Sequence, residues 1–419
     1  MTHLRHIQYS LLISLLIALP CVADSSLTME HLDPIEVDKS LSLPQLVEQT
    51  LEKYPDRLIN EALAQQAEAW QTRGDSWFAG STALSLDYNT DQIANDQGTR
   101  EASAKLEATV WNWGQRSAAQ DVAQQSQLSA EKQSQAVKLE VAHLVREALW
   151  EMALADIRWQ QAKYSVDISA QLLEKVKRRV ELGDLARADL LLAEGEHLQN
   201  RSLLTQAEAE VMHSRKNYAS LTQTTRMPAQ YQEQLSPIKQ IENNHPQLEA
   251  INALIARKQA GIEWAKTTDT INQPKINIGG KTSRDQYGLE DMQSAGVGVV
   301  IPFGHSTYDA PEIAGAHLEL NQALAQREHL VRQLEKGLHE AEHTLEVTRQ
   351  ELSIAQQLKQ IAETHLNMTQ ISFTAGEINL LDLLKIQARS LEAIRNAKEQ
   401  EVKLQRNIAL YNQAVGAQP

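Results

Sequence analysis

The sequence is poor in cysteine, aromatic residues and long apolar runs. Among 419 residues there is one cysteine, and aromatic residues make up 5% of the chain, with three phenylalanines. A single cysteine excludes disulfide bonds within the chain, so stability must come from packing and assembly. Few aromatic residues argue against a thick conventional core. Alanine, leucine, glutamine, glutamate and lysine dominate instead, which is typical of long helices.

One apolar run occurs near the N-terminus. Leu11–Leu19 follows Arg5 and precedes Pro20 and the small-residue segment Cys21–Ala23. This pattern predicts a secretory signal peptide over residues 1–23, with cleavage after Ala23. The alternative that Cys21 is a lipid-anchor cysteine, instead of being removed with the signal peptide, stays open.

The charge balance is acidic. The chain has 40 Lys and Arg against 54 Asp and Glu, a formal charge of −14. Loss of the signal peptide, which holds one arginine and no acid, leaves 39 against 54, or about −15. Phosphate binding needs clustered basic residues, so no nucleic-acid partner is expected. Beyond the signal peptide, no apolar stretch approaches the ~20 residues of a spanning helix. If the chain crosses a membrane, it must do so as a closed β-barrel.

Several landmarks occur twice. They are Gly183 and Gly376, Pro55 and Pro246, and Gly114 and Gly304, at offsets of 193, 191 and 190 residues. A repeat this long in a chain of this length indicates a duplicated half, not a solenoid array. Long helical patterns flank Gly183 in the first copy and Gly376 in the second. We therefore predict two helical hairpins, each turning at a glycine with positive φ.

In each half the hydrophobic period changes from 3.6 to 2 after a shorter helix. Alternation covers residues 82–91 and 102–113 in the first half, and 276–279 and 295–301 in the second. Polar segments join each pair, which predicts strand hairpins with solvated turns. Each half thus consists of a short helix, a strand hairpin, a very long helix, a turn and a long helix.

The long helices are predicted to carry most of the mass. A proline-free run from about residue 115 to 181 would be on the order of 100 Å long as a helix. Two domains are predicted. Repeat 1 covers residues 24–236, with a β-hairpin at about 82–113 and a helical hairpin at about 115–224. Repeat 2 covers residues 237–419, with a β-hairpin at about 274–303 and a helical hairpin at about 310–417. Four strands do not close a barrel and single hairpins this long are unstable, so an oligomer is expected.

These ordered landmarks resemble those of the TolC-type outer-membrane efflux proteins, the outer membrane factors of tripartite efflux systems. The segments Arg73–Gly80 and Trp111–Arg116 and the two glycine turns carry the resemblance, which covers nearly all of the chain after the signal peptide. It implies an α+β membrane protein and a homotrimer. Twelve strands, four from each copy, would form a β-barrel continued by a long periplasmic α-helical barrel, in the outer membrane of a Gram-negative bacterium.

The resemblance also implies a function. The protein would be an exit duct that passes small toxic molecules or metal cations from an inner-membrane pump of the RND type and a periplasmic adaptor to the exterior. The sequence has no Gly-x-x-x-x-Gly-Lys loop and no evident catalytic constellation, so neither an enzyme nor a cofactor is expected. A periplasmic coiled-coil scaffold or adaptor, and the duct of a type I protein secretion system, remain alternatives.

The resemblance implies roles for the hairpin tips. Gly183 with Leu185, and Gly376 with Ile378, match the family's turn motif, a glycine beside an exposed apolar residue that abuts the adaptor. An ordinary helix C-cap is the alternative for the glycines.

Asp382 occupies the position where the family commonly places a carboxylate that faces the tunnel near its closed end. Threefold symmetry would make it a ring that attracts cations. Lys385 stands where relatives often have a second acid, which would change ion preference. The alternative for Asp382 is a helix-start acid following Asn379.

Histidines and aromatic residues give two further expectations. His339 and His343 lie one turn apart and are weak metal candidates, but a site needs a third or fourth ligand and a solvated helix face is the better interpretation. Trp111, Trp113 and Phe303 are predicted to mark a membrane-interface belt at the periplasmic rim of the barrel.

Overall fold

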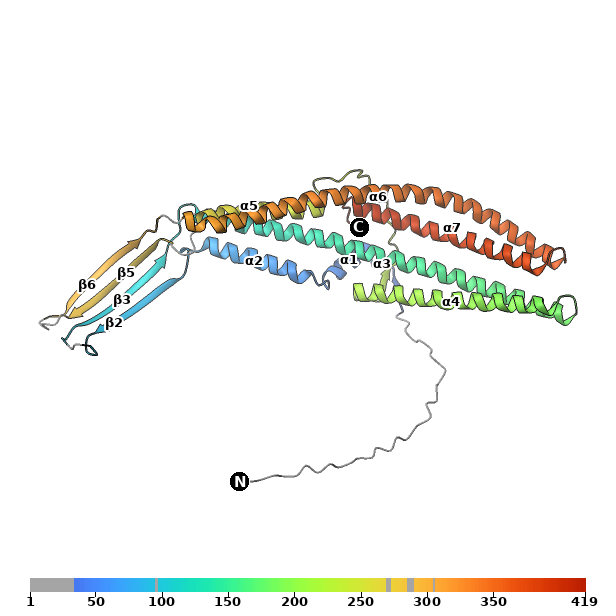
Figure 1. Cartoon of the computed structure of the whole chain (residues 1–419), viewed down its shortest axis with the longest axis horizontal. Helices are drawn as coiled ribbons and strands as arrows, with labels where there is room; N and C mark the ends of the chain where they lie inside the picture. The colour runs from blue at the N-terminus through green and yellow to red at the C-terminus, as the bar shows by residue number, and fades with distance from the viewer. Residues whose placement is uncertain (1–33, 95–96, 269–272, 285–289, 304–305) are drawn as a thin grey trace, which may run out of the picture. The chain divides into compact units, whose positions relative to one another are not determined.

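The computed structural model describes residues 34–94, 97–268, 273–284, 290–303 and 306–419. The predicted signal peptide lies outside these residues. The elements, drawn in Figure 1, are β1 (Glu36–Asp38), α1 (Leu43–Leu51), α2 (Arg57–Asp75), β2 (Thr82–Thr90), β3 (Arg100–Thr109), α3 (Gln115–Glu181), α4 (Arg187–Thr222), β4 (Arg226–Pro228), α5 (Pro246–Thr267), β5 (Lys275–Arg284), β6 (Met292–Val300), α6 (Ser306–Thr374) and α7 (Leu380–Ala414).

The same order of elements occurs twice, as α2-β2-β3-α3-α4 and as α5-β5-β6-α6-α7. The prolines act differently in the two copies. Helix α5 begins at Pro246, as predicted, whereas α2 begins at Arg57, two residues after Pro55. Helix α6 begins at Ser306, ahead of its predicted start at Pro311, which lies inside the helix. Because proline has no backbone N–H, Pro311 removes one hydrogen bond near the start of the helix, and the helix continues on both sides of it.

The four long strands form an antiparallel sheet in the order β2-β3-β5-β6. Its register aligns Leu84 with Leu106, Leu106 with Ile278, and Ile278 with Val297. Since side chains alternate along a strand, these residues share one face. That face is apolar and between 43 and 72% exposed, and it comprises Leu84, Leu86, Tyr88, Leu106, Ile276, Ile278, Val297 and Val299. The sheet therefore leaves a large apolar surface without cover in a single chain.

The opposite face of the sheet is polar. Lys275 Nζ lies 2.8 Å from Glu107 Oε1, and Lys281 Nζ lies 3.4 Å from Glu101 Oε2. The two faces thus differ in chemistry, as expected for a sheet between an apolar and an aqueous environment.

A compact core forms where α1 packs on α3. Helix α1 starts at a capping box made by Ser42 and Gln45, which satisfies two free N–H groups. Its buried Leu46 and Val47 contact a cluster that includes Val141 and Tyr218. Burial of each such aliphatic side chain contributes about 1.5–3 kcal/mol. None of the described helices combines the length and apolarity needed to cross a membrane.

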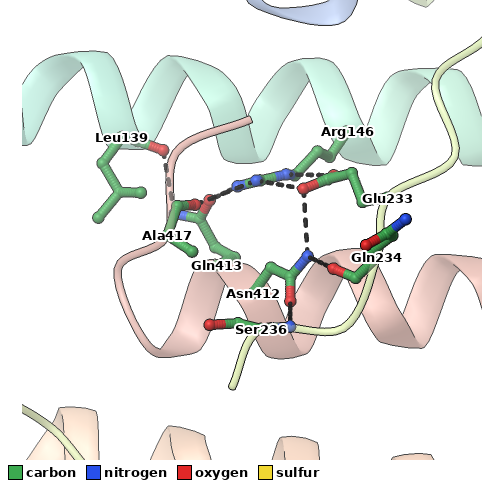
Figure 2. A network of polar contacts seen from close by, with 8 residues as sticks. All are labelled: Leu139, Arg146, Glu233, Gln234, Ser236, Asn412, Gln413 and Ala417. Carbon is green, nitrogen blue, oxygen red and sulfur yellow. Dashed lines mark hydrogen bonds and ion pairs between the residues drawn. The ribbon is translucent and has the colours of Figure 1, made fainter. Parts of the chain in front are cut away.

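A buried ionic network joins segments that are distant in the sequence (Figure 2). Arg146 of α3 is 1% exposed and binds the Glu233 carboxylate through Nε at 2.8 Å and Nη2 at 2.7 Å. Its Nη1 donates to Gln413 Oε1 at 2.6 Å, and Gln413 Nε2 donates to the Leu139 carbonyl at 3.0 Å. The network fastens α3 and α7 to the segment between β4 and α5.

His245 is buried at the start of α5 and gives the protein a pH-dependent contact. Its Nδ1 accepts the N–H of Gln247, and a Cβ on Gly416, which has φ of 77°, would come within 2.6 Å of the ring. Burial lowers the pKa of His245, with a smaller opposing effect of the Ala414 carbonyl. The folded state thus favours the neutral ring, and protonation of Nδ1 would break the cap.

We expect His245→Asn to reduce acid lability. A lowered folded pKa gives stability that is complete above the unfolded value of about 6.5 and is lost as pH falls through the folded pKa. Asparagine caps a helix without titrating. The thermal midpoint of the variant should therefore fall less between pH 7 and pH 5 than that of the wild type. The same substitution at exposed His317 is the control, and equal pH profiles for all three proteins would contradict this prediction.

Candidate functional site at the hairpin tips

Both helical hairpins turn with the same backbone geometry. Gly183 and Gly376 have φ of 80° and 79°, which confirms the prediction of positive φ. After α3, the N–H of Gly183 bonds to the Val180 carbonyl at 3.0 Å and that of Asp184 to Arg179 at 2.8 Å. The same two bonds recur after α6, at 3.1 and 2.9 Å. Each pair of bonds is a Schellman motif, which ends a helix and satisfies its last carbonyl groups.

The two tips share one apolar cluster. Its buried residues come from α3, α4, α6 and α7 and comprise Leu172, Val176, Ala193, Phe373, Leu380, Leu383 and Leu384. Leu185 and Ile378 pack against this cluster and are partly buried, so the expectation that both are exposed is corrected. The apolar side chain that projects at the first tip is Leu182, at 76% exposure, whereas Ala375 takes the matching position at the second tip.

Arg179 links the first tip to the second. Its Nε lies 2.6 Å from Asp184 Oδ2, its Nη1 donates to the Phe373 carbonyl at 3.2 Å, and its guanidinium lies 5.0 Å from the Phe373 ring centroid. Its side chain is 25% exposed. Arg179 thus caps the last turn of α6 through the Phe373 carbonyl, and its guanidinium also stacks on the Phe373 ring. No local sequence pattern marks this contact, because its partners lie 194 residues apart.

Asp382 and Lys385 lie together at the start of α7. The side chain of Asn379 accepts the Asp382 N–H at 2.8 Å and donates through Nδ2 to Asp382 Oδ2 at 2.9 Å. Lys385 Nζ lies 4.0 Å from Asp382 Oδ1, with side-chain exposures of 62 and 53%. Helix capping is therefore performed by Asn379, and the Asp382 carboxylate stays accessible but has a cation beside it.

Aromatic residues at the sheet–helix junction differ in exposure. Trp113 and Phe303 are fully or nearly fully exposed, at 101 and 93%. Trp111 is partly buried, and its Nε1 donates to the Ser76 carbonyl at 3.1 Å, which fixes the end of α2. Trp77, which was not predicted as part of the membrane-interface belt, is 89% exposed. Its position directly before an alternating strand was the available signal.

His339 and His343 are both exposed on α6. Across the described ranges, no group of three or more His, Cys, Asp or Glu side chains is placed to hold a metal ion. The pair has no third ligand there.

Comparison with known proteins adds to this geometry. The profile of the family described as "Outer membrane efflux protein" matches residues 238–415. The cobalt-zinc-cadmium resistance protein CzcC of Cupriavidus metallidurans is 26% identical over 317 residues, which are 71% of this chain and 72% of CzcC. The chain is therefore similar to outer membrane efflux proteins. The protein is located in the outer membrane, with its helical part in the periplasm.

Two solved structures share the fold of this chain. The crystal structure of VceC from Vibrio cholerae matches with a TM-score of 0.71 at 14% identity, over 90% of this chain and 96% of VceC. The crystal structure of CusC matches with a TM-score of 0.71 at 16% identity, over 90% of this chain and 92% of CusC. At these identities the likeness concerns the fold alone.

Proposed function

We propose that three copies of this chain form the exit duct of a tripartite efflux system. The observation that carries the proposal is the open sheet. Among the described residues, one side of β2 and one side of β6 have no paired strand, and unpaired edges of this length are normally covered or closed. Three copies would supply a twelve-stranded barrel, with the apolar face toward lipid and the paired charges toward the lumen. Each of the two repeats, residues 24–236 and 237–419, would add one β-hairpin and one helical hairpin.

The long helices support the same assembly. Helix α6 packs on α5 and α7, and α4 packs on α3 and α1. On α6 an apolar stripe recurs every seven residues and remains 38–64% exposed, made by Val347, Ile354, Ile361 and Met368. A seven-residue apolar repeat is the pattern of a coiled-coil seam. On α4, Leu191 and Leu198 are likewise exposed. We infer that these surfaces meet across the copies.

Assembly and conduction test this function together. Purified full-length protein should run as a trimer-sized species and conduct ions in a planar bilayer. Ile354→Glu should abolish the trimer, since it places a charge in the α6 seam. Gln356→Glu, an exposed change two residues along the same helix, should leave it intact. A monomeric, non-conducting wild-type protein would overturn the duct.

The tips are the proposed docking end. The turns at Gly183 and Gly376 would meet a periplasmic adaptor, with Leu182 as the projecting contact and Leu185 and Ile378 as supports. An RND-type inner-membrane pump would supply the energy. Metal cations are the proposed cargo, since CzcC is named for cobalt, zinc and cadmium resistance, with other small toxic molecules as the second possibility. Deletion of the gene should raise sensitivity to these metals more than to dyes or detergents.

Asp382 and Lys385 are proposed to set ion preference at the constriction, and their removal should act in opposite directions. Asp382→Asn leaves the lysine charge and should shift the reversal potential toward anion preference, while Lys385→Gln frees the carboxylate and should shift it toward cations. Lys336→Gln, an exposed change on α6, is the charge-matched control. Unchanged ion selectivity in both Asp382→Asn and Lys385→Gln would mean that Asp382 has only a structural role at the start of α7.

A further inference from the structure

The apolar face of the sheet ends in two adjacent arginines. Arg100 is the first residue of β3 and Arg284 the last of β5, and the antiparallel register pairs them directly. Strand alternation puts both on the face that carries Leu106 and Ile278, and both are exposed. Side chains directly opposite each other have Cβ atoms about 5 Å apart, a distance at which like charges repel. An anion between the two guanidinium groups would relieve this repulsion.

The described residues neutralise this arginine pair only in part. Arg284 Nε lies 2.7 Å from Asp291 Oδ1, with both side chains 45% exposed, and no described carboxylate forms an ion pair with Arg100. In the adjoining turn, Asp91 Oδ2 already accepts the N–H of Gln97 at 2.8 Å. The lysines of the opposite face differ, since Lys275 and Lys281 each have a glutamate partner. One positive charge of the pair thus remains without a described counterion.

The position of the pair relative to the membrane indicates what the ligand is. The helices are periplasmic, so the β2–β3 and β5–β6 turns face the exterior. Strand β3 has 10 residues, Arg100–Thr109, and a tilted membrane-spanning β-strand has about 9–11 residues, so the two ends of β3 reach the two edges of the apolar band. Arg100 is the outermost β3 residue on the lipid-facing side. The guanidinium groups therefore lie at the depth of the outer-leaflet head groups.

We propose that Arg100 and Arg284 together bind the phosphate group of a phosphorylated lipid of the outer leaflet. Guanidinium groups stay charged and bind phosphate oxygens in a bidentate manner, and the apolar face beside them accommodates acyl chains. Asp291 would hold Arg284 in position without neutralising the pair. This site rests on the proposed function only in requiring that the sheet lies in the membrane.

Lipid binding by the purified full-length trimer tests the site. Native mass spectrometry would measure the bound fraction of lipid A bearing two phosphates, of the same lipid after phosphate removal, and of phosphatidylglycerol, with inorganic phosphate as competitor. Arg100→Gln with Arg284→Gln should lower lipid A affinity at least tenfold. The control, Lys275→Gln with Lys281→Gln, removes the same charge from the opposite face and should bind as the wild type does. Arg100→Lys with Arg284→Lys keeps the charge without the bidentate geometry and should give an intermediate loss.

Five results would contradict the lipid site. They are wild-type binding by the glutamine double variant, equal loss in the lysine control, equal binding of the dephosphorylated lipid, preference for phosphatidylglycerol, and displacement by millimolar inorganic phosphate. Conductance in phosphatidylcholine bilayers is the separate readout, and it should be unchanged in the arginine variants. If neither the wild type nor the variants conduct, the proposed exit duct is contradicted. The proposed lipid site is tested separately, by the lipid-binding comparison alone.

Discussion

Replacement of Arg146 by alanine is expected to lower the free energy of unfolding by about 3–5 kcal/mol, the cost of leaving a buried partner charge uncompensated. The Glu233 side chain is 11% exposed and receives two of its hydrogen bonds from Arg146. Without the guanidinium, its charge would remain in the interior, and within the described part of the chain the amide of Asn412, at 3.3 Å, would be its one remaining side-chain donor. Gln413 Oε1 would also lose its donor while Gln413 Nε2 keeps its bond to Leu139, so the contact of α7 with α3 would weaken.

The thermal midpoint in detergent, followed by circular dichroism, measures this effect. Arg57→Ala is the matched control, since Arg57 pairs with Glu61 at 3.3 Å but both side chains are half exposed. Exposed pairs contribute about 0–1 kcal/mol, so the midpoint of the control should hardly change. Arg146→Met with Glu233→Leu should restore part of the loss, because no charge is then left buried. Equal midpoints for the Arg146 and Arg57 variants would show that the network adds nothing to stability.

Structural features that depend on neighbouring residues in the sequence were predictable from it. The change from period 3.6 to period 2 marked the strands correctly because the sheet has one apolar and one polar face, and Leu84, Leu86 and Tyr88 lie on the same side. The glycine turns were predictable for a related reason. A helix that ends in a Schellman motif needs positive φ at one position, and glycine adopts it without strain.

Contacts between distant segments could not be predicted in this way. Arg146 meets Glu233 and Gln413 across 87 and 267 residues, and nothing near Arg146 distinguishes it from the exposed arginines of α3. The burial of Leu185 and Ile378 was missed for the same reason. A turn beside a glycine exposes an apolar residue in isolation, but here the two tips cover each other's residues. The cluster formed by α3, α4, α6 and α7 decides which apolar side chain projects.

Replacement of Arg179 by glutamine is expected to favour the open state of the duct. Within one copy, Arg179 makes the polar contact between the two tips described above, so separation of the hairpins would break its bond to the Phe373 carbonyl and its stacking on the ring. A hydrogen bond from a charged group contributes about 1.5–3 kcal/mol and an exposed cation–π contact about 0.5–1 kcal/mol. Loss of about 1.4 kcal/mol per copy shifts an equilibrium tenfold. If three copies open together, the factors multiply to about a thousand.

Single-channel recording would detect this shift as a higher open probability, and cells would become more sensitive to large antibiotics that leak through an open duct. Arg178→Gln is the matched control, because this neighbouring side chain is exposed and the change in charge is identical. Phe373→Leu removes the ring but keeps the carbonyl, so it should give a smaller increase. Equal effects of the Arg178 and Arg179 variants would mean that the local charge, not the contact with α6, controls opening. A response confined to Arg179 and Phe373 would place the control in the contact itself, since these two changes share that contact but not the loss of a charge.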